Sequence, residues 1–347
     1  MIFDPILDIF RGKAITVPPL DGAFRPNTAL DEAPLHNELN AVDNLCLHDG
    51  KVLASSGATL FALTEGSAPE QLETFPAEIT ALASDGTSLA VALDDGSLIE
   101  DGTPAKTPDT ITCITALAYA PDGTLWLTNG SDRHKASAWV VDLMEKNAAG
   151  SLWRRAPDGA FESVASGLAW PNGLLPRTNG VVAVSESWKH RLIRVENGKI
   201  TPILRHLPGY PARLAPSHDG GAWLALFAPR NRLVELVLQE KHYRFDMMES
   251  IPPDYWIAPA LSSGNSFLEP LQCGAIRTMG IHKPWSPTRS YGLVARLDEN
   301  MVPTYSLHSR ADGQRHGVCS LIEENGKLLV GVRGGNCILA PDTEEAK

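Results

Sequence analysis

The sequence predicts an antiparallel all-β protein. Asp or Asn is followed directly by Gly fourteen times, and most of these pairs lie between short apolar runs such as residues 51–54 and 124–127. Asp-Gly and Asn-Gly supply the positive φ angles that two-residue hairpin turns require. Apart from residues 5–10, which predict a short N-terminal helix, no stretch carries capped helical periodicity over three turns.

Recurring apolar units predict that the hairpins form a β-propeller. Six similar units begin near Asn44, Ile79, Ile114, Gly173, Arg213 and Val318. The first three are separated by close to the ~40 residues of a four-stranded propeller blade, and the longer later intervals leave room for insertions. We therefore expect residues 1–347 to form a single domain, a six-bladed β-propeller with four-stranded antiparallel blades.

Two segments lie outside this repeat. Residues 1–40 are expected to form an N-terminal extension and a closing strand, with residues 13–18 as the candidate strand, because pairing with the last blade removes exposed sheet edges. Residues 250–290 are rich in Pro, Ser and Trp, and Pro lacks the donor that a central strand needs. We interpret them as a long insertion that covers one end of the central channel, or alternatively as a peripheral packing loop.

Composition excludes several classes of protein. A hydrophobic fraction of 43% with eight Trp is typical of a globular protein with a sizeable core. The formal charge of −11, without clustered Lys and Arg, argues against a nucleic-acid partner. The N-terminus lacks a basic signal-peptide region, and no segment reaches the ~20 apolar residues of a membrane span, so we expect a cytoplasmic protein without a membrane partner.

Neither the cysteines nor any common catalytic motif indicates a metal site or an active site. The five Cys are widely spread and form no Cys-x-x-Cys pair, which predicts buried, reduced thiols rather than disulfides or a zinc site. The sequence contains no Gly-x-Ser-x-Gly, His-Glu-x-x-His, Walker or Gly-x-Gly-x-x-Gly motif. Functional residues must therefore come together from the ends of different blades.

Several motifs resemble a known family. Residues 166–174, Ser-Gly-Leu-Ala-Trp-Pro-Asn-Gly-Leu, followed by residues 181–187 and 190–195, resemble the fourth-blade signature of strictosidine-synthase-like proteins. Residues 206–211 and 220–224 resemble the next blade of that family. The resemblance is specific over about residues 105–235. It implies a six-bladed propeller related to gluconolactonases and paraoxonases, with a small-molecule substrate in the central channel.

The resemblance also implies where a metal would lie. Metal-dependent relatives hold a cation such as Ca²⁺ in the channel with carboxylate and amide oxygens. Asp43, with Asn44 beside it, and Asn172 match two of these positions. Thr115 stands where an Asn is expected, and Ala212-Arg213 stands where an Asp-Asn pair is expected.

Arg213 changes the expected electrostatics of the channel. A guanidinium beside a divalent cation is strongly repelled at low dielectric. We therefore infer that Arg213 replaces the metal, pairs with Asp43 and offers its planar fork to an anionic ligand such as a carboxylate or phosphate. No cofactor is then expected. Two alternatives stay open: Ca²⁺ on Asp43 and Asn172, or an Arg213 that points outward into a surface ion pair.

Other residues complete the predicted site. Strictosidine synthases use a Glu in the last blade, and the matching residues 313–320 contain none but do contain His316. An imidazole is suited to general base work, so His316 and Asp43 are the catalytic candidates, with a structural role for His316 as the alternative. The remaining candidates are substrate-binding residues, namely Arg213, Asn172, Asn44, Thr115, Trp188 and Trp256. For the Trp residues, and for Trp285 beside them, packing between blades is an equally good explanation.

Three functions are compatible with these residues. The first is a hydrolase acting on a lactone or ester in the central channel. The second is an amine and aldehyde condensation of the strictosidine synthase type, which the absent Glu opposes. The third is binding of an anionic metabolite without turnover.

Overall fold

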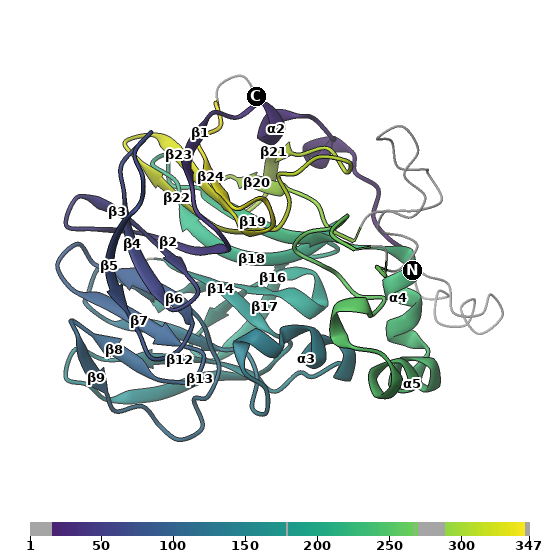
Figure 1. Ribbon diagram of the computed structural model, residues 1–347. Coiled ribbons are helices and arrows are strands. Elements are labelled where there is room, and N and C mark those ends of the chain that lie inside the picture. Colours follow the sequence, from purple (N-terminus) through teal and green to yellow (C-terminus); the bar gives the residue numbers. More distant parts are fainter. Residues whose placement is uncertain (1–15, 178–179, 267, 270–288, 344–347) are drawn as a thin grey trace.

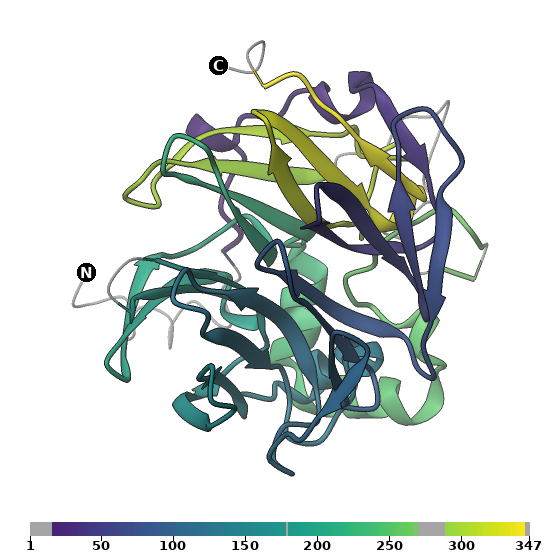
Figure 2. The same cartoon turned by 90° about the vertical axis from the view of Figure 1, so that its left-hand side faces the viewer.

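The computed structural model describes residues 16–177, 180–266, 268–269 and 289–343 and confirms the six-bladed propeller. Its strands form six four-stranded antiparallel sheets. Figure 2 shows the sheets as blades around a central axis, with the three longer α-helices behind them. Cys273 and Trp285, together with the helix predicted at residues 5–10, lie outside the described residues.

Each blade begins with its strand nearest the axis. Blade 1 contains β2 (Val42–His48), β3 (Lys51–Ser56), β4 (Thr59–Leu63) and β5 (Glu70–Thr74), and blade 2 contains β6 (Ile79–Ser84), β7 (Leu89–Leu93), β8 (Leu98–Glu100) and β9 (Thr103–Ala105). Blade 3 contains β10 (Ile114–Tyr119), β11 (Leu125–Asn129), β12 (Gly150–Arg155) and β13 (Phe161–Leu168), and blade 4 contains β14 (Pro171–Pro176), β15 (Val182–Glu186), β16 (Arg191–Glu196) and β17 (Lys199–Leu204). Blade 5 contains β18 (Gly209–Pro216), β19 (Ala222–Pro229), β20 (Leu293–Leu297) and β21 (Pro303–His308), and blade 6 contains β22 (Val318–Glu324), β23 (Lys327–Val332), β24 (Cys337–Leu339) and β1 (Leu35–Glu38). The predicted unit starts therefore fall at or near the starts of the six inner strands.

The predicted turn chemistry is also confirmed. Both residues of the Asp49-Gly50 pair have positive φ angles, 48° and 69°, and this pair joins β2 to β3. The same pattern joins β8 to β9, β16 to β17 and β22 to β23. Two successive positive φ angles define the type I′ turn, whose twist matches that of the flanking strands.

A strand from within residues 1–40 closes the ring, as predicted, but it is not the candidate segment at residues 13–18. The closing strand is β1, which pairs antiparallel with β24 through contacts such as Leu35 with Leu339. Residues 16–18 of the predicted segment are not in a strand. Pro18 and Pro19 have no backbone donor for a ladder, whereas residues 35–38 contain no Pro.

Short helices interrupt blades 3 and 5. Helix α3 (Trp139–Glu145) lies between β11 and β12, and helices α4 (Arg232–Gln239) and α5 (Lys241–Ser250) lie between β19 and β20. All three lie on one face of the propeller, at the right in Figure 1. The blade 5 insertion thus begins before residue 250, and its first helix is capped by Asn231, whose Oδ1 accepts a hydrogen bond from Leu233 N at 2.8 Å. No helix within the described ranges is long and apolar enough to cross a membrane.

Apolar side chains fill the spaces between neighbouring blades. Leu53 of blade 1 and Val91 of blade 2, for example, belong to one buried cluster, and Leu174 of blade 4 joins Ala116 and Trp126 of blade 3 in another. The four described cysteines are free and buried, as predicted. Packing between blades fixes the inner strands around the axis and so positions the site.

Candidate functional site

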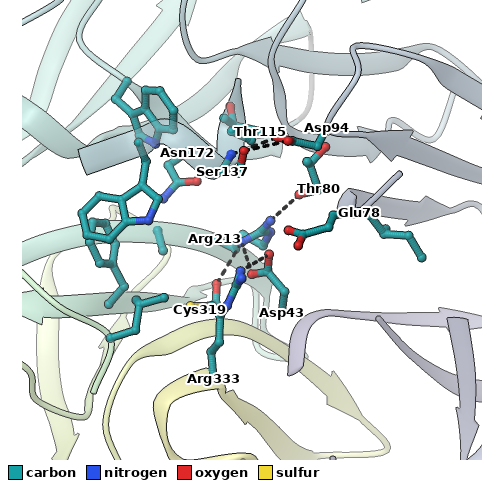
Figure 3. Close-up of a pocket in the computed structure, with 17 residues that line it drawn as sticks. Asp43, Glu78, Thr80, Asp94, Thr115, Ser137, Asn172, Arg213, Cys319 and Arg333 are labelled. Carbon is teal, nitrogen blue, oxygen red and sulfur yellow. Dashed lines mark hydrogen bonds and ion pairs between the residues drawn. The ribbon is translucent and has the colours of Figure 1, made fainter. Parts of the chain in front are cut away.

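Each inner strand has an irregularity near its start. The register of β2 against β3 shifts between Val42 and Leu45, and comparable shifts occur in β6, β10, β14, β18 and β22. A β-bulge leaves a residue outside the ladder and re-aims its side chain. Each blade contributes a residue from its bulge to one cavity (Figure 3), and these six residues are Asp43, Thr80, Thr115, Asn172, Arg213 and Cys319.

We call this space the helix-side cavity, because Trp139, the first residue of α3, and Ser137, just before that helix, line it as well. Its volume is about 330 Å³, within the range of small-molecule sites. Trp139, Trp170 and Phe227 form an aromatic wall, with the Trp139 and Phe227 rings edge to face at 5.4 Å. The wall faces a polar side built from blades 1, 2, 5 and 6.

The aromatic wall is held firmly. Trp170 has a φ angle of 54°, which is uncommon for a bulky residue, and its ring stacks on Trp188 at 5.2 Å. Trp188 Nε1 donates a hydrogen bond of 2.7 Å to Oδ1 of Asp142, a fully buried residue of α3. Trp188 therefore supports the wall from behind Trp170 and is not itself among the residues that line the cavity.

An ion triad occupies the polar side. Asp43 Oδ1 lies 3.4 Å from Nη1 of Arg213, and Asp43 Oδ2 lies 2.8 Å from Nη1 of Arg333. Both oxygens of one carboxylate thus face guanidinium groups from different blades. The Asp43 carboxylate raises the pKa of Arg333 above its ordinary value. One carboxylate between two guanidiniums leaves the triad with a net charge of +1.

Backbone oxygens hold Arg213 in the channel. Its Nη2 donates to the carbonyl oxygen of Thr80 at 2.5 Å, and its Nη1 reaches the carbonyl oxygen of Cys319 at 3.4 Å. The side chain starts in blade 5 and so contacts blades 1, 2 and 6. Gly173 permits this arrangement, because a Cβ there would lie 2.3 Å from the Ala212 carbonyl oxygen and 2.7 Å from Arg213 Cα.

Two further carboxylates face the cavity. Asp94 Oδ1 and Oδ2 accept hydrogen bonds from the backbone N and the Oγ of Ser137, at 2.9 and 2.7 Å. Glu78 is exposed, and its carboxylate has no hydrogen-bond or ion-pair partner among the residues that the structure describes. Figure 3 shows the Glu78 carboxylate on the same side of the cavity as Arg213 and Asp43. Glu78 is thus placed to accept a proton from a bound molecule or water.

Cys319 is not a nucleophile in this environment. Burial raises the pKa of its thiol to about 12. The thiolate is the reactive form of cysteine, so the group stays protonated near neutral pH.

The donor set does not fit a divalent cation. Calcium requires several oxygen ligands, and both oxygens of Asp43 already contact guanidinium groups that repel a cation. No group of three or more His, Cys, Asp or Glu suited to a metal occurs in the described part of the chain. Of the two residues matched to metal ligands, Asn172 alone keeps its side-chain oxygen without a protein partner within that part.

The predicted binding residues differ in what they offer to a ligand. Asn172 lines the cavity with its amide facing inward (Figure 3). Thr115 lines the cavity too, but its Oγ1 donates to the Pro171 carbonyl oxygen at 2.5 Å. Asn44 is buried beside the ring, where its Nδ2 donates to Ser55 Oγ at 2.8 Å, and it is not among the lining residues. Asn44 Oδ1 has no hydrogen-bond partner among the described residues, but it is buried outside the lining, so Asn172 is the predicted amide that faces the cavity.

His316 and Trp256 lie away from this cavity. His316 is buried, with Nδ1 at 2.7 Å from Ser290 Oγ and Nε2 at 2.9 Å from the Arg310 carbonyl oxygen. Trp256 is also buried, and its Nε1 donates to the Ile251 carbonyl oxygen at 2.7 Å. Neither residue lines the helix-side cavity, so their positions do not support contact with a substrate there.

Sequence reasoning missed Glu78, Asp94, Arg333 and the pair Trp139 and Trp170. A positional signal exists for two of them, since Asp94 and Arg333 directly follow the second strands of their blades, β7 and β23. That position lies next to the start of the inner strand and hence at the same end of the channel. Trp139 comes from an inserted helix, for which the blade repeat gives no signal.

Comparisons with known proteins reveal distant structural similarity. No family model matches the sequence, and no curated protein matches it. A solved structure of a protein assigned as a gluconolactonase superposes with a TM-score of 0.54 at 13% identity, covering 89% of this chain and 91% of that one. Regucalcin from Agrobacterium tumefaciens, a calcium-binding protein, superposes with a TM-score of 0.52 at 15% identity, covering 91% of this chain and 87% of that one. At these identities the similarity establishes the six-bladed propeller fold.

Proposed function

We propose that this protein is a metal-independent hydrolase that acts on a small lactone or ester in the helix-side cavity. The observation that carries the proposal is the Asp43–Arg213–Arg333 triad at the polar side of a cavity with an aromatic wall. Its guanidinium groups are suited to stabilise the negative oxygen that develops when a carbonyl group is attacked. The similarity to a gluconolactonase fold supports lactones as the first substrates to test.

Each group that lines the cavity would have its own role in hydrolysis. Nη1 of Arg333 contacts Asp43, whereas its Nε and Nη2 have no protein partner within the described ranges and remain available to a carbonyl oxygen. Glu78 would accept a proton from water as the water oxygen attacks the carbonyl carbon. The proton then passes to the alkoxy oxygen as its bond to that carbon breaks, which yields a carboxylic acid and an alcohol. Asn172 and the aromatic wall would orient the substrate.

This mechanism differs from that of a calcium-dependent lactonase. A calcium ion polarises the carbonyl oxygen as a Lewis acid. Here guanidinium groups supply the positive charge, so the activity is expected to persist in the presence of a chelator.

Binding without turnover is the second candidate function. This function is favoured because polar groups that line the cavity, such as Thr115 and Arg213, already make hydrogen bonds within the protein. In that case the triad would serve only to recognise a carboxylate. Condensation of the strictosidine synthase type has less support, because residues 313–320 contain no Glu and His316 lies away from the cavity.

The test is a screen of lactones and aryl esters by turnover and by thermal shift, in buffer containing EDTA. We expect chelator-insensitive hydrolysis, together with stabilisation by the carboxylate products. Glu78→Gln should abolish turnover while preserving product binding, whereas Glu73→Gln, an exposed Glu on the outer strand β5, should change neither. Stabilisation by carboxylates without turnover of any substrate would select the binding function. Activity that requires added calcium would contradict both.

A further inference from the structure

The axial channel contains a second cavity on the side away from the helices. It has a volume of about 440 Å³ and is lined by the middle and end of all six inner strands. Its walls are largely aliphatic, with lining residues that include Leu45, Leu82, Leu117, Leu174, Leu214 and Leu321. We call it the hairpin-side cavity, because the inner strands run towards their hairpin turns at this end.

Its polar lining groups are occupied by protein partners. Glu323 accepts a hydrogen bond of 2.6 Å from Trp223 Nε1 and also pairs with His218. Tyr119 OH lies 3.3 Å from Glu100, and Ser84 Oγ lies 2.9 Å from His48 Nδ1. The hairpin-side cavity therefore offers mainly apolar surface to a ligand.

Arg213 is the residue common to the linings of both cavities. Its side chain crosses from blade 5 to Asp43 in blade 1, Thr80 in blade 2 and Cys319 in blade 6. Figure 3 shows the guanidinium in the middle of the ring of bulge residues. The three contacts fix the side chain as a bar between the two halves of the channel.

We infer that Arg213 is a specificity-determining partition, which restricts substrates to compact molecules and excludes longer alkyl chains from the hairpin-side cavity. The inference rests on the proposed function in that the helix-side cavity is where the substrate binds. Removing the bar would connect two spaces whose combined volume is more than twice that of the helix-side cavity alone. The leucine walls would then bury an alkyl chain, and each buried methylene strengthens binding by about fourfold, from ~0.8 kcal/mol per CH₂.

The charges permit the test without leaving an unpaired carboxylate. In an Arg213→Ala variant, Asp43 keeps its 2.8 Å contact with Arg333, so the acid retains one guanidinium partner. Arg333→Ala is the matched control, since it removes a guanidinium from the same triad and leaves the bar in place. The two variants therefore separate loss of charge from opening of the channel.

The experiment measures dissociation constants by calorimetry for a series of γ-lactones with unbranched side chains from one to eight carbons, with every protein carrying Glu78→Gln so that the lactones are not hydrolysed during the titration. In the otherwise wild-type protein and in Arg333→Ala, affinity should stop rising after the first few carbons. In Arg213→Ala, affinity should continue to rise by about fourfold per methylene. The double variant Arg213→Ala with Leu82→Trp, in which the indole fills the hairpin-side cavity, should lose this rise in affinity. If Arg213→Ala does not fold, Arg213→Gln takes its place.

The outcomes separate this inference from the proposed function. If the wild type binds and hydrolyses short lactones but Arg213→Ala has an unchanged chain-length profile, the partition is refuted and the hydrolase stands. If the wild type binds no lactone, yet Arg213→Ala binds long ones and the Leu82→Trp double variant does not, the partition stands and the hydrolase fails. A length profile that changes equally in Arg333→Ala, or no binding to any variant, overturns the partition.

Discussion

Asp43 is predicted to stabilise the propeller by separating two guanidinium groups at its axis. The substitution Asp43→Asn keeps the shape of the side chain and removes the charge that Arg213 and Arg333 share. At an effective dielectric constant of ~20, a contact of 3.4 Å corresponds to a gross attraction of about 5 kcal/mol. Desolvation offsets part of this attraction, and the side chains of Asp43 and Arg213 retain 17% and 16% exposure, which adds screening.

The expected loss of unfolding free energy for Asp43→Asn is about 2–4 kcal/mol, near the lower part of the range for breaking a buried ion pair. With an unfolding entropy of about 2.1 cal/mol/K per residue, 1 kcal/mol shifts the melting temperature of a chain this long by about 1.5 °C. The melting temperature should therefore fall by about 3–6 °C. Equilibrium unfolding in urea at pH 7 and calorimetry provide two independent measurements.

A double-mutant cycle assigns the effect to the triad. In an Arg213→Gln background, Asp43→Asn should cost less by about 1–2 kcal/mol, because only one guanidinium then loses its partner. Asp109→Asn removes the charge of an exposed Asp and should change stability by no more than about 0.5 kcal/mol. A loss for Asp43→Asn no larger than this control, or a coupling energy of zero with Arg213, would refute the account of the triad.

Three further predictions concern other parts of the structure. Burial lowers the pKa of His308 from 6.5 to about 4, so the unfolded chain binds a proton at this residue more readily than the folded protein does. The contribution of His308 to the unfolding free energy should be complete above pH 6.5 and fall by about 3 kcal/mol towards pH 4. Urea unfolding at a series of pH values measures this loss, which His308→Gln should lack. Burial also raises the pKa of Cys46, Cys113 and Cys319 to about 12. With Cys273, which lies outside the described residues, replaced by Ser, the native protein should react with a thiol reagent at pH 8 far more slowly than the urea-unfolded protein. Rapid labelling of Cys319 in the native protein would disprove its burial. Gly173→Ala should displace Arg213, because the added Cβ would meet Ala212 O, and we expect a loss of at least 1–3 kcal/mol in unfolding free energy, typical of overpacking, together with a smaller Asp43–Arg213 coupling energy.

The sequence predicted the architecture well because local turn chemistry and the blade repeat agree. Asp49-Gly50 adopts the two positive φ angles expected of a hairpin, and the units at Ile79 and Ile114 start at the first residues of β6 and β10. The closing strand was misplaced because Ile15, Thr16 and Val17 have β-forming side chains. Pairing with β24 depends on tertiary position, which strand propensity does not contain.

The polar side of the candidate site was predicted in part. Asp43, Asn172 and Arg213 carry signals in blade-start motifs, and the bulges at these positions turn their side chains towards the axis. Arg333 and Glu78 lie at other positions in the repeat and carry no such motif signal. Whether His316 reaches the axis depends on the path of the segment before β22, and a sequence motif does not determine that path.

The response to calcium decides whether guanidinium groups from blades 5 and 6, rather than a metal ion, provide the positive charge at the axis of this propeller. Removal of divalent ions with EDTA and addition of millimolar Ca²⁺ should both leave the melting temperature of the wild type unchanged within about 1 °C, whereas a site filled at 100 times its Kd would add about 2.7 kcal/mol. Stoichiometric calcium in the purified protein, with a melting temperature that falls on chelation and recovers on calcium addition, would contradict the account.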